Sequence, residues 1–206
     1  RALPGRGGRV AFEVGGTRIA GVELGLAGEY QRDNAAIAVA ALCALSARGL
    51  RVPVAAVRDG LTQVRWPARL EHHAATSSMP ALLFDAAHNP DGCAALARHL
   101  QSEQARPRVL VFGAMADKDY PQMLALLAPH VEHVVYVQPQ LPRAASPQQL
   151  QACLPGRAAR HAGDALRRAK TAAGSAGLVI CAGSIFVVSE LRARALQLPS
   201  DPLIRM

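Results

Sequence analysis

Several features are scarce in this chain of 206 residues, and each scarcity excludes a class of protein. No apolar run approaches the roughly 18 residues of a membrane-spanning helix, and the N-terminus RALPGRGGRV lacks the apolar stretch of a signal peptide. Aromatic residues make up only 4% of the chain and the basic residues are scattered. Proteins that bind single-stranded nucleic acid usually need aromatic stacking platforms and basic runs. We therefore expect a cytoplasmic protein that contacts neither membrane nor nucleic acid, and we expect a monomer.

Metal and disulfide signals are equally sparse. The four cysteines are far apart, without CxxC spacing and in surroundings rich in Ala, Leu and Val, so we expect small buried hydrophobic residues in a reducing compartment. The adjacent pair His72-His73 would point to opposite faces of a strand and cannot grip one ion. No GxxxxGK[ST] or GxGxxG follows a strand, so these residues do not encode a complete nucleotide-binding enzyme. The cysteines are Cys43, Cys93, Cys153 and Cys181.

The composition is that of a globular protein with a modest positive charge. Half of the residues are apolar, 18% are charged and the formal net charge is +8. All basic residues except Lys118 and Lys170 are arginine, a bias that fits genome composition. A mild positive excess suits a small ligand that carries phosphate.

Residues 1–64 have the pattern of the edge of a domain. Two β-rich runs flank a Gly-Gly pair of the kind that closes a hairpin, and two helical stretches follow without a matching parallel strand. The expected elements are strands at 9–14 and 17–24 around Gly15-Gly16, a helix over 30–48 that ends at Gly49, and a helix from Pro53 to about residue 64.

Residues 65–206 alternate short apolar strands with helices. Continuous apolar strands between helices indicate a Rossmann-like, doubly wound α/β domain whose mainly parallel sheet is covered on both faces. We expect strands at 81–85, 108–113, 132–137 and 177–182, and helices at about 90–104, 119–129, 146–153, 163–173 and 184–197.

Polar side chains follow three of these strands, at the edge where ligands bind in such sheets. Asp85 and His88 follow the first, the cluster Asp117-Lys118-Asp119 follows the second, and Gly183-Ser184 opens a helix after the last. Each also has a structural interpretation: Asp85 as a helix cap, His88 as a loop histidine, the charged cluster as a solvated loop and Ser184 as an N-cap. Their convergence on one edge favours a binding site.

Five segments carry a more specific signal: LAGEYQRDNAAIAVAAL (26–42), WPARLE (66–71), DAAHNPDG (85–92), FGAMADKD (112–119) and AGSIFVVSE (182–190). In this order they resemble the folylpolyglutamate synthase/dihydrofolate synthase family, which belongs with the Mur ligases. The resemblance covers essentially the whole chain but only the back half of such an enzyme. The ATP-binding central domain, with its phosphate loop and Mg²⁺ ligands, is expected to precede Arg1, and residues 1–64 to be its remnant.

The resemblance implies roles for five residues. Asn34 corresponds to a residue that touches the adenine of ATP, and Arg69 to the catalytic arginine that reaches the phosphates. Asp85 corresponds to an acid that contacts the nucleotide through ribose. His88 corresponds to a catalytic histidine near the incoming glutamate, and Ser184 to a serine linked to glutamate binding. The chain departs from the family pattern at Tyr30, Ala68 and Ala86, which replace a histidine and two glycines.

The reaction that the resemblance implies is an ATP-dependent ligation. ATP phosphorylates a carboxyl group of dihydropteroate or of a folate glutamate, and L-glutamate displaces phosphate to form an amide. ATP and Mg²⁺ are the expected cofactors, and this chain alone is expected to be inactive. Two alternatives remain: a Mur-type cell-wall peptide ligase, which shares the Asp-x-x-His-Asn/Thr-Pro loop, and a non-catalytic Rossmann-like module that binds a nucleotide or a partner. WPARLE and FGAMADKD favour the folate enzymes over cell-wall ligases.

Overall fold

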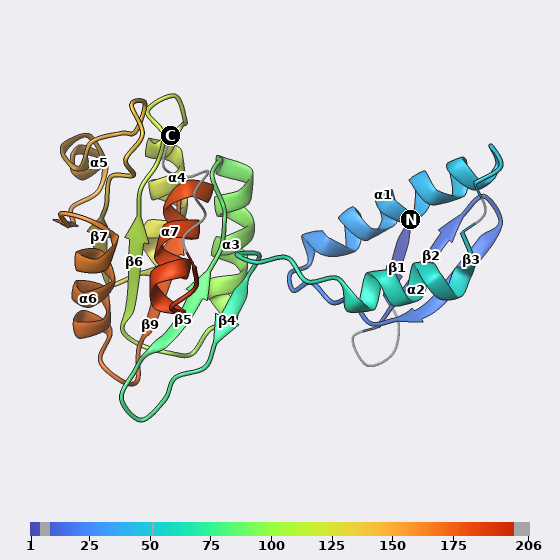
Figure 1. Cartoon of the computed structure of the whole chain (residues 1–206), viewed down its shortest axis with the longest axis horizontal. Coiled ribbons are helices and arrows are strands. Elements are labelled where there is room, and N and C mark those ends of the chain that lie inside the picture. Colours follow the sequence, from blue (N-terminus) through green and yellow to red (C-terminus); the bar gives the residue numbers. More distant parts are fainter. Residues whose placement is uncertain (5–8, 51, 200–206) are drawn as a thin grey trace. The chain divides into compact units, whose positions relative to one another are not determined.

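The chain folds as two compact units, Arg1–Pro67 and Ala68–Met206 (Figure 1). The structure is a computed structural model that describes residues 1–4, 9–50 and 52–199. Each unit is treated by itself below. No helix in these described ranges is long and apolar enough to cross a bilayer.

The first unit packs two helices against a small antiparallel sheet. The predicted hairpin is confirmed as β2 (Val10–Val14) and β3 (Thr17–Val22), joined by Gly15 and Gly16 at φ +55° and +79°. Positive φ at both positions is what a two-residue hairpin turn requires. The predicted helices are α1 (Tyr30–Ser46) and α2 (Val54–Gln63), while the edge strand β1 (Ala2–Pro4) was not expected. Their shared core consists of Val10, Phe12, Ile19, Val22, Ala35, Val39 and Val57.

The second unit is built on a six-stranded sheet of order β4-β5-β9-β6-β7-β8, in which only β4 runs antiparallel to its neighbour. This confirms the predicted α/β fold with a mainly parallel sheet. The strands are β4 (Glu71–His73), β5 (Ala81–Phe84), β6 (Arg108–Phe112), β7 (His133–Tyr136), β8 (Arg157–Ala158) and β9 (Leu178–Ala182). The helices are α3 (Pro90–Ser102), α4 (Tyr120–Leu127), α5 (Pro147–Cys153), α6 (Ala162–Ala173) and α7 (Ile185–Ala195), with a short 3₁₀ turn η2 (Ala128–His130).

Helices cover both faces of this sheet, which explains why its central strands are apolar at every position. Alternate residues of β5, β6 and β9, such as Phe84, Val111 and Cys181, share one buried cluster with apolar residues of α6 and α7. The residues between them, including Leu83 and Ile180, are fully buried on the opposite side, where α3, α4 and α5 contact one another in series. A strand buried on both faces cannot alternate apolar with polar residues.

Two of the four cysteines are buried, as the sequence predicted, and one is exposed. Cys93 and Cys181 are fully buried, and burial raises the pKa of the Cys93 thiol to about 12. Cys43 is half-buried. Cys153 is exposed, contrary to the prediction, because it occupies the last position of the short helix α5, where its thiol lies 3.6 Å from the carbonyl of Gln149. No disulfide joins any of these four described residues.

Candidate functional site

Three loops with polar residues meet at one edge of the second unit's sheet. Strands β5, β9 and β6 are adjacent and parallel, and their ends are in register, with Phe84 beside Cys181 and Phe112 beside Ala182. The loops that begin with Asp85, Gly183 and Gly113 therefore leave the sheet together. This confirms the expected convergence, at the place where open α/β sheets bind ligands.

The loop after β9 passes so close to its neighbours that only glycine fits at position 183. The Gly183 amide donates to the carbonyl of Ala87 at 2.8 Å, which joins this loop to the one after β5. A Cβ on Gly183 would lie 2.6 Å from the carbonyl oxygen of Gly113 and equally close to the ring of Phe112. Its φ of +106° is also one that other residues rarely adopt. Gly183 thus holds the three loops in close contact.

Asp85 is buried, with 4% of its surface exposed, and both of its carboxylate oxygens bind backbone amides. Oδ2 accepts from the amide of Leu70 and Oδ1 from the amide of Ala87, each at 2.9 Å. Burial raises the pKa of Asp85, and these two hydrogen bonds oppose the rise without cancelling it. Asp85 therefore joins its own loop to the segment that precedes β4.

The helix after this loop is capped by Asn89, so the interpretation of Asp85 as the helix cap is wrong. The Asn89 side chain accepts from the amide of Gly92 at 2.8 Å, and Pro90 occupies the first helical position of α3. Proline is favoured there because its missing N–H would have no partner inside the helix.

The WPARLE segment forms a turn around Arg69. Ala68 and Leu70 have φ of +56° and +48°, the left-handed region that residues with a Cβ rarely enter. The amide of Ala68 donates to Glu71 Oε2 at 2.8 Å, and its carbonyl accepts from the amide of Ala86 at 2.8 Å. The family pattern has a glycine where this chain has Ala68. The positive φ explains that pattern, because glycine adopts such a conformation without steric cost. We call residues 68–71 the Arg69 turn.

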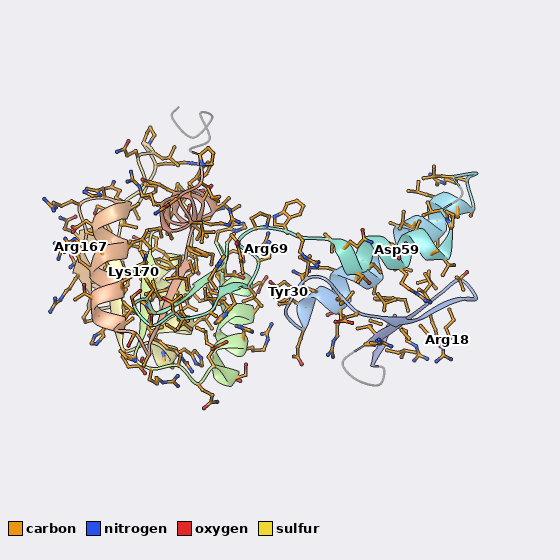
Figure 2. The ribbon with its side chains drawn as sticks, turned by 60° about the horizontal axis from the view of Figure 1, so that its bottom comes forward. Arg18, Tyr30, Asp59, Arg69, Arg167 and Lys170 are labelled. Carbon is orange, nitrogen blue, oxygen red and sulfur yellow. The ribbon has the colours of Figure 1, made fainter. Side chains whose placement is uncertain are left out.

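Arg69 itself is half-buried, and no described residue accepts a hydrogen bond from its guanidinium or forms an ion pair with it. Figure 2 labels it where the chain enters the second unit. Its charge is felt by Asp85, whose pKa it pulls down against the larger effect of burial. The turn thus presents a cation whose hydrogen-bonding fork is available to a ligand.

Glu71 connects the Arg69 turn to α7. Its two oxygens accept from Nε and Nη2 of Arg192 at 2.6 and 2.9 Å, and Oε1 lies 3.0 Å from Nε2 of His73. Burial acts to raise the pKa of Glu71, but the hydrogen bonds from Arg192, Ala68 and His73 outweigh it and lower the pKa to about 2. Sequence reasoning missed this pair, because 121 positions separate its members.

His88 and Ser184 occupy the loops after β5 and β9. His88 is half-buried, and its Nδ1 lies 2.9 Å from the carbonyl oxygen of Ala86. Because a carbonyl only accepts, Nδ1 carries the proton and Nε2 of the neutral ring is an acceptor. Ser184 is buried at the N-cap position of α7, but its side chain makes no capping hydrogen bond. The first-turn amides of α7 therefore lack the side-chain partner that an N-cap usually supplies.

The other predicted residues belong to the first unit or to the segment between β6 and α4. Asn34 is exposed on α1 in the first unit, where its amide donates to Gln31 Oε1 at 3.0 Å. Asp119 caps α4 by accepting from the amide of Gln122 at 3.1 Å. Asp117 and Lys118 are exposed and 3.9 Å apart, as the solvated-loop interpretation predicts.

A family comparison agrees with this geometry. The family described as "Mur ligase, glutamate ligase domain" matches residues 68–185, more than half of the chain. The chain belongs to this Mur ligase family. The match begins at the Arg69 turn and ends just after Ser184, so it includes the whole group of loops described above.

Curated relatives and solved structures of this Mur ligase domain point to folate enzymes. The folylpolyglutamate synthase of Lacticaseibacillus casei is 33% identical over 92% of this chain and 44% of its own length. The Mycobacterium tuberculosis folylpolyglutamate synthase complexed with ADP and AMPPCP gives a TM-score of 0.79 at 32% identity, over 98% of this chain and 48% of that one. Escherichia coli FolC in complex with DHPP and ADP gives 0.76 at 29%, over 91% and 44%. The chain spans less than half the length of each, and the resemblance found in the sequence is confirmed.

The described part of the Mur ligase domain contains no cluster of side chains that could coordinate a divalent metal ion. No three His, Cys, Asp or Glu side chains among the described residues are arranged to hold an ion. Phosphate groups, in contrast, match the guanidinium of Arg69 chemically. Among the described residues, the Arg69 guanidinium fits a nucleotide phosphate, and we derive no step through a metal ion.

Proposed function

We propose that this chain is the C-terminal part of an ATP-dependent ligase that joins L-glutamate to dihydropteroate or to a folate glutamate. The observation that carries the proposal is the Arg69 turn, whose backbone is held by two carboxylates while no described residue accepts a hydrogen bond from the Arg69 guanidinium. Ligases of this chemistry must neutralise phosphate charge while a phosphoryl group moves. The named folate synthases, two of them in complex with ADP, support the same assignment.

The reaction proceeds in two steps in this proposal. The substrate carboxylate attacks the γ-phosphorus of ATP, and ADP leaves as the new acyl phosphate forms. The amine of L-glutamate then attacks the acyl carbon, the amide bond forms, and inorganic phosphate and a proton are released. Arg69 binds the phosphate oxygens in both steps, because its planar fork matches two of them at once.

The other site residues bind or orient the reactants in this proposal. Nε2 of His88 accepts a hydrogen bond from the glutamate ammonium, and the uncapped start of α7 at Ser184 favours a glutamate carboxylate. Asp85 contacts the ribose. Its oxygens already accept one amide each, but a carboxylate oxygen has a second acceptor site for a hydroxyl. Asn34 contacts the adenine from the first unit.

Arg69 gives the direct test. In the full-length protein, Arg69→Ala should lower kcat for glutamate ligation by about 100-fold to 1,000-fold, as for the loss of one charge-stabilising donor in other enzymes. Arg69→Lys should recover little, because a point charge does not reproduce the planar fork. Arg194→Ala is the matched control, since Arg194 is exposed and, among the described residues, forms an ion pair with Glu190 on its own helix. Turnover of Arg69→Ala equal to that of the control would remove Arg69 from the site.

A further inference from the structure

We propose that Glu71 and Arg192 are positioning residues that fix the direction of the Arg69 guanidinium. The inference rests on the proposed function, in which Arg69 acts on phosphate. It goes further because neither residue touches the substrate in this scheme. Both act through the backbone of the Arg69 turn.

The contact geometry joins the turn to α7 through a single carboxylate. Glu71 Oε2 accepts from the amide of Ala68 at 2.8 Å and from Nε of Arg192 at 2.6 Å. Oε1 accepts from Nη2 of Arg192 at 2.9 Å. A two-bond arginine–carboxylate pair fixes the plane of the carboxylate as well as its position. The oxygen that holds the first residue of the turn is therefore itself held by α7.

The turn needs such support because its backbone is strained. Ala68 and Leu70 flank Arg69, and each has a positive φ, a conformation that is unfavourable for a residue with a Cβ. Glu71 holds the amide of Ala68, and the Asp85 carboxylate holds the amide of Leu70. When one of these carboxylates is removed, the strained turn can relax toward ordinary dihedral angles, and the side chain between them changes direction.

The Glu71–Arg192 pair differs from an ordinary surface ion pair. Its side chains are 20% and 23% exposed, and it joins residues 121 positions apart. The Glu190–Arg194 pair lies on the same helix, four residues apart, with side chains 35% and 53% exposed. Exposed pairs of this second kind contribute little to stability. Glu190–Arg194 is therefore a matched control that removes an arginine–glutamate pair from α7 without touching the turn.

A double-mutant cycle in the full-length protein tests the proposal. Glu71→Ala and Arg192→Ala should each lower kcat about 10- to 100-fold, the effect of a misplaced catalytic group. In an Arg69→Ala background, the same changes should lower kcat by less than about twofold, because the group they position is gone. Arg194→Ala should leave kcat unchanged. Each variant is assayed well below its melting temperature, where it is folded. An equal loss of kcat on Glu71→Ala in the presence and in the absence of Arg69 would overturn the proposal.

A readout without turnover separates this proposal from the proposed function. In the 206-residue chain, NMR relaxation of the Arg69 Nε–H bond and amide exchange at Ala68 report the order of the turn. Glu71→Ala should lower the order of Arg69 and speed exchange at Ala68, whereas Arg194→Ala should change neither. Unchanged order in Glu71→Ala would overturn the positioning role even if Arg69 proves essential. Reduced order together with wild-type turnover of Arg69→Ala would instead refute the phosphate role of Arg69.

Discussion

Replacing Asp85 by asparagine should destabilise the second unit more than removing the helix cap beside it. The two carboxylate oxygens of Asp85 accept from the amides of Leu70 and Ala87, and an asparagine offers one oxygen and one NH₂ group in the same space. One buried amide therefore loses its acceptor and faces another donor. An unsatisfied buried donor costs about 1–3 kcal/mol. The release of a buried charge offsets part of this, because burial already raises the pKa of Asp85.

The comparison is with Asn89→Ala, which removes the side-chain cap of α3. Asn89 is exposed and water can replace its oxygen, so the expected loss is about 1 kcal/mol. Asp85→Asn should cost about 2 kcal/mol and Asp85→Ala about 2–5 kcal/mol, because alanine leaves both amides without their acceptor. Urea unfolding of the 206-residue chain, followed by circular dichroism, measures these differences.

Amide exchange shows where each loss arises. Asp85→Asn should speed exchange at Leu70 or Ala87 and leave Gly92 protected, whereas Asn89→Ala should affect Gly92 alone. The reasoning is refuted if Asp85→Asn is no less stable than Asn89→Ala, or if it exposes Gly92 instead of Leu70 and Ala87. Either result would mean that the carboxylate does not hold the two loops together.

Three further predictions follow from the same contacts. The folded pKa of Glu71, about 2, lies below its ordinary value of 4.5, so Glu71 contributes stability above pH 4.5 that is lost as the pH falls toward 2. The free energy of unfolding of the wild type should exceed that of Glu71→Gln by about 1–3 kcal/mol at pH 6, and a gap that does not shrink between pH 5 and 3 would contradict this. Gly183→Ala should lower the free energy of unfolding in urea by at least about 2 kcal/mol, because the new Cβ would meet the Gly113 carbonyl and the φ of +106° is unfavourable for alanine. Gly174→Ala is the control, since it shares the positive φ but has open space around the new Cβ. In the full-length protein, His88→Ala should raise the KM for glutamate far more than that for ATP and Asp85→Ala the reverse, and equal changes in both constants would refute this division of roles.

Most of the fold could be predicted from the sequence because its elements carry strong local signals. The central strands are continuous apolar runs, and the helices begin at proline or at capping residues such as Asn89, Asp119 and Ser146. The two strands missed in the second unit lack such signals. β4 is the half-exposed tripeptide Glu-His-His and β8 has two exposed residues, so neither shows apolar periodicity. Both pair at the edges of the sheet, where backbone hydrogen bonds and not burial determine the conformation.

The residue types at this sheet edge were also predictable, but their hydrogen-bond partners were not. The position of Asp85 after an apolar strand marked it as a polar residue at the binding edge, and the structure places it there. The sequence contains no signal that both of its oxygens accept amides, one of them from Leu70, fifteen residues earlier. The partnership of Glu71 with Arg192 depends likewise on how α7 packs, which no local pattern records.

In the proposed function, these two carboxylates hold the backbone around Arg69 and leave its guanidinium to bind phosphate. A carboxylate paired directly with the Arg69 guanidinium would fix its direction, but it would also occupy the donors and cancel the charge that a phosphate needs. In this chain Asp85 and Glu71 bind the amides of Leu70 and Ala68, on either side of Arg69. The carboxylates that orient the turn therefore accept hydrogen bonds from backbone N–H groups and, at Glu71, from Arg192. The backbone on both sides of Arg69 is fixed while no described residue accepts from its guanidinium, so in the proposed function its five donors can bind a transferred phosphoryl group.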